Sequence, residues 1–241
     1  ITNVTPAARV NGIVYDGTNW VMSGPSRHIT KYSNDLSSVV STATNILPGN
    51  PIGQDITFDP TEGDGFYYVC GPQYSISGYP ETVWKLPKDL SSAAVAFIEP
   101  SSISNMVMTG IAFDSAAGTL WIADNTSQII YEFTKAGALT GNYFDSNVSP
   151  RNLNFVEGQL WIGAQAVLNQ YNTLTGSRSK QLYLPRSTDA KMTLSTTSYM
   201  EGLGISSELG LAVFSYGSNV SSTWKLMPME YVKKIGSKNA T

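Results

Sequence analysis

The amino-acid sequence predicts an all-β protein, and three observations lead to this prediction. Charged residues make up only 14% of the 241 positions, against about 25% in a typical globular protein, and Ser and Thr take many of the positions that charged residues would usually fill. The chain holds 21 Gly and 12 Pro, which favour turns, while Thr, Tyr and Trp suit strands better than helices. Finally, one short apolar segment occurs five times along the chain, which indicates a repeat architecture.

The recurring segment begins each unit of the repeat. It reads Gly-Ile-Val-Tyr-Asp at 12–16, and related segments stand at 55–59, 110–114, 152–155 and 202–205. Successive copies lie about 40 to 55 residues apart, which is the period of a propeller blade. A second apolar segment follows each copy across a turn, at 20–22, 68–70, 121–123, 161–163 and 211–213. A third follows at 29–32, 83–86, 130–133, 168–171 and 223–226.

A more polar stretch comes after the third segment of each unit. Apolar inner strands and polar outer strands are typical of four-stranded antiparallel blades around a central channel. The sequence therefore predicts one domain over residues 1–241, a single five-bladed β-propeller. Its blades are expected at about 12–48, 55–100, 110–150, 152–185 and 202–235.

Prolines indicate how the ring closes. Pro48, Pro100, Pro150 and Pro185 each follow the outer stretch of a unit, and Pro6 follows residues 1–5 in the same way. We therefore expect residues 1–5 to form the outer strand of the fifth blade and so to join the two ends of the chain. The competing candidate for this position is the segment 231–235.

The third unit shows a family resemblance most clearly. It combines Gly-Ile-Ala-Phe-Asp at 110–114, Gly-Thr-Leu-Trp-Ile-Ala-Asp at 118–124 and Ile-Tyr-Glu-Phe at 130–133. This unit resembles a blade of the NHL and SMP-30-like propellers, and the count of five also resembles olfactomedin-type and tachylectin-type propellers. The resemblance implies the fold. In SMP-30-like proteins it further implies a metal held by Glu and Asn side chains, for which Glu201 is the best match.

Residues just before each first strand are the candidate ligand-binding residues, because propellers place ligands where these loops converge. They are Asn11, Asp55, Thr109, Asn152 and Glu201. Each offers an oxygen, and Ca²⁺ takes six to eight oxygen ligands. A calcium ion held by Asp55, Asn152 and Glu201 is therefore one expectation. The alternative is that all five merely line a water-filled channel.

Other residues with catalytic potential are better explained as structural. Asp16, Asp59 and Asp114 occupy one repeat position directly before a turn, where Asp favours an Asx turn. His28 is the only histidine, which excludes histidine-based metal clusters, and we expect it at the surface or at a strand edge. Cys70 aligns with small or apolar residues of the other units, so we expect a buried, unreactive thiol.

Composition excludes several classes of partner and site. The net charge is −3 with no basic run, which argues against a nucleic-acid surface. The apolar run at 93–98 is too short to cross a bilayer, so no membrane insertion is expected. A single cysteine excludes an internal disulfide and any zinc site with several cysteines. Sequons make Asn3, Asn125, Asn219 and Asn239 glycosylation candidates in a secreted chain.

These observations favour a non-catalytic recognition or scaffold module that is extracellular or surface-exposed. Its low charge and its many Ser, Thr and Asn residues suit a carbohydrate or protein partner. One alternative is a calcium-dependent lactonase or hydrolase of the SMP-30-like kind, with its site at the channel mouth and with Asn11 joining the three expected ligands. Another is a structural repeat unit of a filament or virion.

Overall fold

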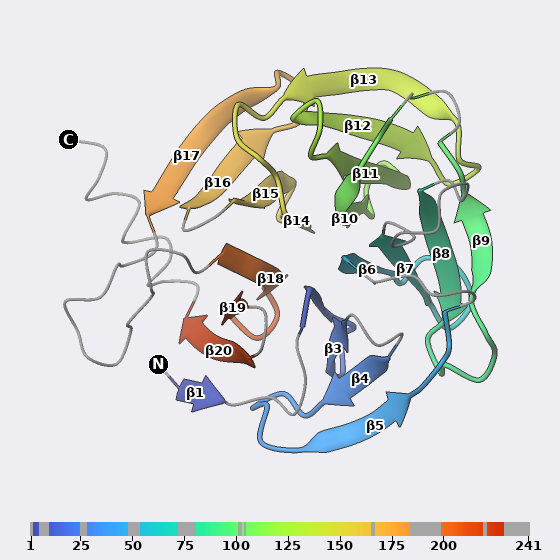
Figure 1. Ribbon diagram of the computed structural model, residues 1–241, viewed down its shortest axis with the longest axis vertical. Coiled ribbons are helices and arrows are strands. Elements are labelled where there is room, and N and C mark those ends of the chain that lie inside the picture. The colour runs from blue at the N-terminus through green and yellow to red at the C-terminus, as the bar shows by residue number, and fades with distance from the viewer. Residues whose placement is uncertain are drawn as a thin grey trace.

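The computed structural model describes residues 2–4, 10–24, 28–47, 54–71, 81–100, 103, 105–164, 167–183, 199–218 and 221–228. All the helices and strands assigned within these residues are β-strands, twenty in number. A search of the same residues finds no helix with the length and apolar character needed to span a membrane. The strands form sheets arranged around a common centre (Figure 1).

Four of the sheets are built from strands that follow one another in the sequence. In each, consecutive strands pair antiparallel, and the chain runs from the innermost strand to the outermost. From inside to outside they are β2 (Gly12–Tyr15), β3 (Trp20–Ser23), β4 (Ile29–Tyr32) and β5 (Val39–Ala43); β6 (Asp55–Asp59), β7 (Phe66–Gly71), β8 (Thr82–Pro87) and β9 (Val95–Ile98); β10 (Met108–Asp114), β11 (Thr119–Asp124), β12 (Ile129–Thr134) and β13 (Leu139–Asp145); and β14 (Asn152–Val156), β15 (Gln159–Ala164), β16 (Val167–Asn172) and β17 (Ser177–Tyr183).

The remaining sheet combines the two ends of the chain. Its strands are β18 (Tyr199–Ser206), β19 (Leu211–Ser218), β20 (Ser221–Pro228) and, at the edge, β1 (Thr2–Val4). Thr2 pairs with Leu226 and Val4 with Trp224, in antiparallel register. This is the partner that the sequence predicts for the N-terminal segment. The competing segment, 231–235, lies outside the described residues.

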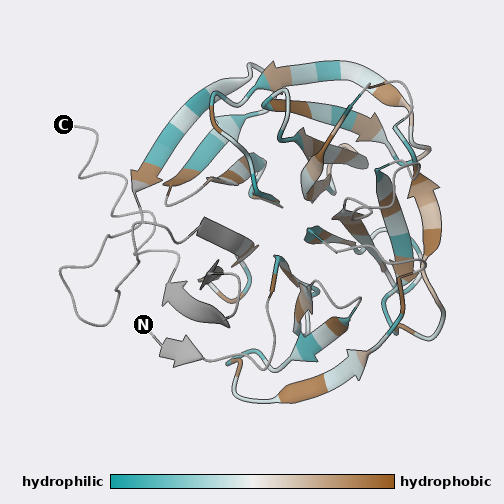
Figure 2. Ribbon diagram, in the orientation of Figure 1, coloured by the Kyte–Doolittle hydropathy of each residue, from teal (hydrophilic) through white to brown (hydrophobic). Residues whose placement is uncertain are grey.

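The prediction of an all-β propeller made of four-stranded antiparallel blades is confirmed. One apolar residue from each of the five recurring segments lies on an innermost strand and is fully buried; these residues are Ile13, Ile56, Ile111, Leu153 and Leu203. Every residue of β10 is buried, whereas all but one residue of the outer strand β13 are exposed. Figure 2 shows the same contrast, with hydrophobic colour on β10 and β11 and hydrophilic colour on β13 and β17. The hydrophobic effect thus orients each sheet with its apolar end toward the centre.

The core lies between neighbouring sheets. One cluster joins Tyr68 and Cys70 of β7 to Ile111 and Phe113 of β10, and a second joins Val14 and other residues of the first sheet to the β6 sheet. The expectation that Cys70 is buried is confirmed, since none of its surface is exposed.

Glycine allows the innermost strands to approach closely at two equivalent repeat positions. A Cβ atom on Gly12 would lie 2.6 Å from the Cα atom of Asp55. A Cβ atom on Gly110 would lie 2.8 Å from the Cγ atom of Leu153. Neither distance is tolerated, so these positions require glycine. Adjacent sheets therefore converge tightly at this end of the channel.

The repeated aspartates form the expected turns. Oδ1 of Asp16 accepts the backbone N–H groups of Thr18 and Asn19 at 2.9 and 2.7 Å. The same oxygen of Asp59 and of Asp114 accepts equivalent bonds from the turns that follow them. The structural interpretation of these three residues is confirmed, and each turn leads from the innermost strand to the second strand of its sheet.

Candidate functional site

The predicted ligand-binding residues lie where the innermost strands begin. Asn11, Asp55, Thr109 and Asn152 are all buried, with at most 6% of their surface exposed. Glu201 lies in β18, and its side chain falls outside the described residues. Its backbone occupies a register shift between Met200 and Gly202, and Thr109 occupies the equivalent shift in β10. Such β-bulges bend a strand at its end.

Side chains from this group cross the centre of the ring. Oδ2 of Asp55 accepts the backbone N–H of Ile111 at 3.0 Å and that of Leu153 at 2.9 Å. Nδ2 of Asn152 donates to the backbone carbonyl oxygen of Asn11 at 2.8 Å. Leu153 and Asp55 belong to sheets that are not neighbours in the ring, and so do Asn152 and Asn11. The structure thus brings these residues together, and they hydrogen-bond opposite sheets to one another across the centre.

Thr109 serves the same purpose between adjacent sheets, because its hydroxyl donates to the carbonyl oxygen of Pro150 at 2.7 Å. Asp55 is the only carboxylate whose side chain the structure describes within the predicted group. Burial raises the pKa of Asp55 well above its ordinary value, although bonds from the backbone of Leu153, Ile111 and Ile56 and from the Asn152 side chain oppose this shift. Within the described residues, no group of three or more His, Cys, Asp or Glu side chains is arranged to hold a metal. Calcium binding at this end stays a prediction.

A cavity opens at the opposite end of the channel, where the innermost strands finish. Its volume is about 420 Å³. It is lined by residues 15–17, 58, 60, 113, 115, 155–157 and 205–208, so that all five sheets contribute. We call this cavity the funnel. Sequence reasoning missed it, although a signal was present: Tyr15, Phe58, Phe113 and Phe155 stand at one repeat position, just before the turn.

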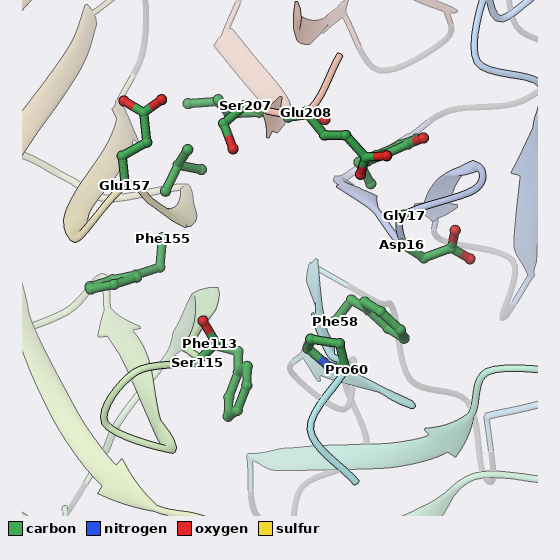
Figure 3. A pocket seen from close by; sticks show the side chains of 14 residues that line it. Asp16, Gly17, Phe58, Pro60, Phe113, Ser115, Phe155, Glu157, Ser207 and Glu208 are labelled. Carbon is green, nitrogen blue, oxygen red and sulfur yellow. The ribbon is translucent and has the colours of Figure 1, made fainter. Parts of the chain in front are cut away.

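The aromatic residues at this repeat position line the funnel, but their rings are turned away from its open centre (Figure 3). In Figure 3 the rings of Phe58, Phe113 and Phe155 point away from the open centre, whereas the hydroxyl groups of Ser115 and Ser207 point toward it. The Phe58 ring packs against Tyr67 of the same sheet with 5.4 Å between ring centres. The surface offered to a ligand therefore combines hydroxyl groups, backbone and the edges of apolar side chains.

Lysines lie behind two of these rings and bind the aspartate turns. Nζ of Lys88 lies 5.0 Å from the Phe58 ring centre and donates to the carbonyl oxygen of Asp16 at 3.0 Å. Lys135 lies 5.5 Å from the Phe113 ring centre and 2.5 Å from Oδ2 of Asp59. Burial acts to raise the pKa of Asp59, but bonds from Lys135 and the Thr61 turn outweigh it, and the pKa is lowered. Each lysine joins its own sheet to the preceding one.

Both carboxylate oxygens of Asp16 interact with neighbouring groups. Beyond its turn, Oδ2 accepts the hydroxyl of Tyr67 at 2.5 Å, and Nζ of Lys31 lies 4.0 Å away. Burial, and then the bond to this carboxylate, raise the pKa of Tyr67. Asp16 thus joins two sheets at the edge of the funnel.

Glu157 and Glu208 are the exposed carboxylates of the funnel. Glu157 and Gly158 form the two-residue turn between β14 and β15, with φ values of 53° and 72°. Positive φ at both positions defines the hairpin turn that Asn-Gly favours, so a glutamate here is an unusual choice. Burial raises the pKa of Tyr15, and the negative charge of Glu208 raises it further. Both residues line the funnel.

The structure also places His28 and two of the four glycosylation candidates. His28 is half-buried and lies directly before β4, in agreement with its expected place at a strand edge. Asn125 lies half-buried in the turn after β11, and Asn3 lies within β1. Asn219 and Asn239 lie outside the described residues. Glycosylation at these four sites stays a prediction.

Comparison with known proteins gives the fold. No protein-family model matches the chain, and no curated protein matches it. Among solved structures, the glutaminyl cyclase of Myxococcus xanthus is 13% identical, with a TM-score of 0.67 and coverage of 94% of each chain. A chain from a nidogen/laminin complex is 17% identical, with a TM-score of 0.57 and coverage of 88% of this chain and 75% of that chain. At these identities the likeness shows a β-propeller and nothing finer about function.

Proposed function

We propose that this chain is a non-catalytic recognition module, extracellular or surface-exposed, whose ligand binds in the funnel. The observation that carries this proposal is that equivalent repeat positions of all the sheets build one cavity of about 420 Å³. Pockets for small ligands have volumes of about 300 to 1,000 Å³. Carbohydrate and protein segments are the two ligand classes that we consider.

The chemistry of the funnel supports binding. Hydroxyl groups of Ser115 and Ser207 face its centre, and they can both donate and accept hydrogen bonds. The buried carboxylates beside it, Asp16 and Asp59, are tied to tyrosine, lysine and turn N–H groups. A rigid wall of this kind offers polar groups in fixed positions, which favours specific recognition.

A protein partner is included because one of the similar structures comes from a nidogen/laminin complex. That likeness extends to the fold alone, so the partner of this chain has to be identified by experiment. A propeller presents its loops on two faces, and the funnel marks one of them as the face to test first.

We also propose that the propeller has five blades, with the sheet of β1 and β18–β20 as the fifth. In support, β18 contacts both β2 and β14, and β1 pairs with β20 at the outer edge. The innermost strands would then form a closed ring with no open seam between the first and the last sheet. Closure of this kind protects strand edges from pairing with other chains.

The binding proposal is tested by blocking the funnel. Ser115 is exposed in the turn after β10, so Ser115→Trp should fill the opening without disturbing the core. Ser91→Trp, at an exposed turn outside the funnel, is the matched control. Wild type and Ser91→Trp are expected to bind the same ligand on a glycan array or on immobilised laminin, and Ser115→Trp to lose it. Equal results for all three proteins would contradict the proposal.

A calcium-dependent hydrolase with its site at the other end of the channel is the second candidate. One observation favours it: Asp55 is fully buried and its side chain lies within the group of oxygen-bearing residues at this end of the channel. Asp55, Asn152 and Glu201 would be the ligands. Because the pKa of Asp55 is raised, Ca²⁺ would have to displace a proton, so binding should strengthen as the pH rises.

Calorimetry with Ca²⁺ tests this candidate on the wild type and on Asp55→Asn. Hydrolysis of a panel of lactones and esters, with and without chelator, tests the activity. Calcium binding that Asp55→Asn abolishes, together with chelator-sensitive hydrolysis, would support it. No heat of binding at millimolar Ca²⁺ would exclude it.

A further inference from the structure

We propose that the face on which the funnel opens carries a second binding site, for a basic side chain of a partner protein that has an apolar neighbour. The site lies between the turn after β10 and the turn between β16 and β17, because β10, β14 and β16 all end on this face. Its two contacts are Asp114 and Leu174. Neither residue lines the funnel, so the site goes beyond the proposed function.

The other two aspartates at this repeat position already have a lysine beside them. Oδ2 of Asp59 lies 2.5 Å from Nζ of Lys135, which belongs to the next sheet. Oδ2 of Asp16 lies 4.0 Å from Nζ of Lys31. Lys88, again from the next sheet, donates to the carbonyl oxygen of Asp16 at 3.0 Å. The fold thus places an ammonium group at both of these turns.

The third aspartate has no such partner. Oδ1 of Asp114 accepts the backbone N–H groups of Ala116 and Ala117 at 2.9 and 3.1 Å, as its equivalents do in their own turns. In the part of the chain that the structure describes, no hydrogen bond or ion pair involves Oδ2 of Asp114, although the residue is only 9% exposed. A carboxylate oxygen in such a place favours an ammonium or guanidinium group from another molecule.

The sequence shows why this partner is missing. In the second and third sheets a lysine, Lys88 or Lys135, stands two positions after the third recurring segment. In the fourth sheet that position holds Thr173, and the whole turn, residues 172–176, has no charged side chain. The chain therefore supplies an ammonium group to two of the three aspartate turns and omits it at the third.

The same turn presents an exposed leucine. Leu174 is 94% exposed, the highest value for a large apolar side chain among the described residues. Leucines in the corresponding turns of the first two sheets fold back onto the core instead. Leu36 is 1% exposed, and Leu90 packs against a buried cluster. Leu174 thus has no role in covering the core and is available to a partner.

Local contacts hold this turn in place. Oδ1 of Asn172 accepts the Leu174 N–H at 2.9 Å. Gly176 has a φ of 63°, and a Cβ atom on it would lie 2.7 Å from the Cβ atom of Phe144, in the sheet that also contains Asp114. A leucine on a turn that is already ordered loses little entropy when it is bound, which favours its use as a contact residue.

A short segment with a basic residue beside an apolar one suits both groups. Its basic side chain would donate a charge-assisted hydrogen bond to Oδ2 of Asp114. Its apolar side chain would remove the surface of Leu174 from water. The electrostatic part of this binding should weaken as salt is added.

The experiment uses three capped tripeptides, with the sequences Leu-Lys-Leu, Leu-Gln-Leu and Ser-Lys-Ser. NMR titrations follow the backbone N–H signals of Ala116 and Ala117, which bond to Asp114. Leu-Lys-Leu should bind about tenfold more tightly than Leu-Gln-Leu, which lacks the charge. It should bind about threefold more tightly than Ser-Lys-Ser, which lacks the apolar groups. Equal binding of Leu-Lys-Leu and Leu-Gln-Leu, or no binding of Leu-Lys-Leu at about 10 mM, would overturn the inference.

Two variants separate the contacts. Asp114→Asn keeps an acceptor oxygen for its turn and removes the charge, so the preference for lysine over glutamine should fall to about twofold or less. Leu174→Ser should remove the preference for leucine and keep that for lysine. Asp89→Asn is the matched control, because Asp89 is exposed and its Oδ1 accepts the Ser91 N–H in a similar turn. A lysine preference that survives Asp114→Asn, or that Asp89→Asn removes, would contradict the assignment.

Thr173→Lys gives a test that needs no partner, because it restores the lysine of the repeat. Its ammonium group should reach Asp114 as that of Lys135 reaches Asp59. We expect a higher melting temperature than for Thr173→Gln, and we expect this difference to vanish when Asp114→Asn is added. Thr173→Lys should also abolish the preference for Leu-Lys-Leu over Leu-Gln-Leu. Equal melting temperatures for Thr173→Lys and Thr173→Gln would refute the equivalence of the three turns on which the inference depends.

Discussion

Oδ2 of Asp55 accepts the backbone N–H of Leu153, a residue 98 positions further along the chain, at 2.9 Å. The same oxygen accepts the N–H of Ile111, so one buried carboxyl connects three innermost strands. No other described contact joins so many sheets through one atom. The stability of the ring should therefore depend on this side chain.

Replacing Asp55 by alanine should destabilise the protein strongly. The change leaves two buried N–H groups without an acceptor, and each such group costs about 1 to 3 kcal/mol. We expect the free energy of unfolding to fall by about 2 to 5 kcal/mol, measured by denaturant unfolding. Asp55→Asn keeps an acceptor oxygen and should lose less. Equal stability of Asp55→Ala and wild type would show that other groups take over these bonds.

Glu81 should make stability depend on pH near neutrality. Burial raises the pKa of Glu81 to about 7, from an ordinary value of 4.5. A bond from the Met108 N–H opposes this shift, and the charge of Asp124 adds to it. The folded state thus holds a proton that the unfolded state releases above pH 4.5. The stabilisation is present below this pH and is lost as the pH rises toward 7. Melting temperatures across this window should fall less steeply for Glu81→Gln than for wild type or Glu99→Gln. Parallel curves for all three proteins would contradict this.

Lys135 should stabilise the contact between the second and third sheets. Its Nζ atom lies 2.5 Å from Oδ2 of Asp59, whose side chain is fully buried. Lys135→Met leaves that carboxylate unpaired, and we expect a loss of about 2 to 3 kcal/mol, less than for a fully buried pair because the lysine is partly exposed. Lys85→Met, whose partner Glu62 is exposed, should cost about 1 kcal/mol or less. Chemical unfolding of both variants gives the comparison, and a reversed order would refute it.

Cys70 should stay unmodified in the native protein. It is fully buried, and burial raises the pKa of its thiol, which disfavours the reactive thiolate. A bulky maleimide should label the protein in denaturant and leave it unlabelled in native buffer, as mass spectrometry can measure. Rapid labelling without denaturant would mean that the β7–β10 contact opens readily.

Deleting residues 1–5 should weaken the fold more than deleting residues 236–241. The N-terminal deletion removes β1 and its hydrogen bonds to β20, each worth about 0.5 to 1.5 kcal/mol. The expected loss is about 2 to 4 kcal/mol by denaturant unfolding, a large part of a typical stability of about 5 to 15 kcal/mol. If the N-terminal deletion leaves the free energy of unfolding unchanged, or if the C-terminal deletion lowers it more, another strand closes the ring.

The sequence by itself determined the order and type of the strands. Each unit carries its own apolar segments and its own Asx turn, as at Asp16 and Asp114, so these features depend on residues close together in the chain. Burial of Ile111 and Cys70 follows from the same pattern, because equivalent positions in a repeat face equivalent surroundings. Even the pairing of β1 with β20 could be predicted, from the position of Pro6 relative to the other prolines.

Only the tertiary structure decided what the two ends of the channel contain. Whether Asp55 faces water or crosses to Leu153 depends on how closely the sheets approach the centre, which Gly12 and Gly110 permit but no single unit reveals. The funnel likewise exists only where residues from all the sheets meet, and Lys135 is kept out of it by a partner 76 positions away, Asp59. Local patterns specify a strand and its faces, whereas the distance between strands far apart in sequence results from packing the whole ring.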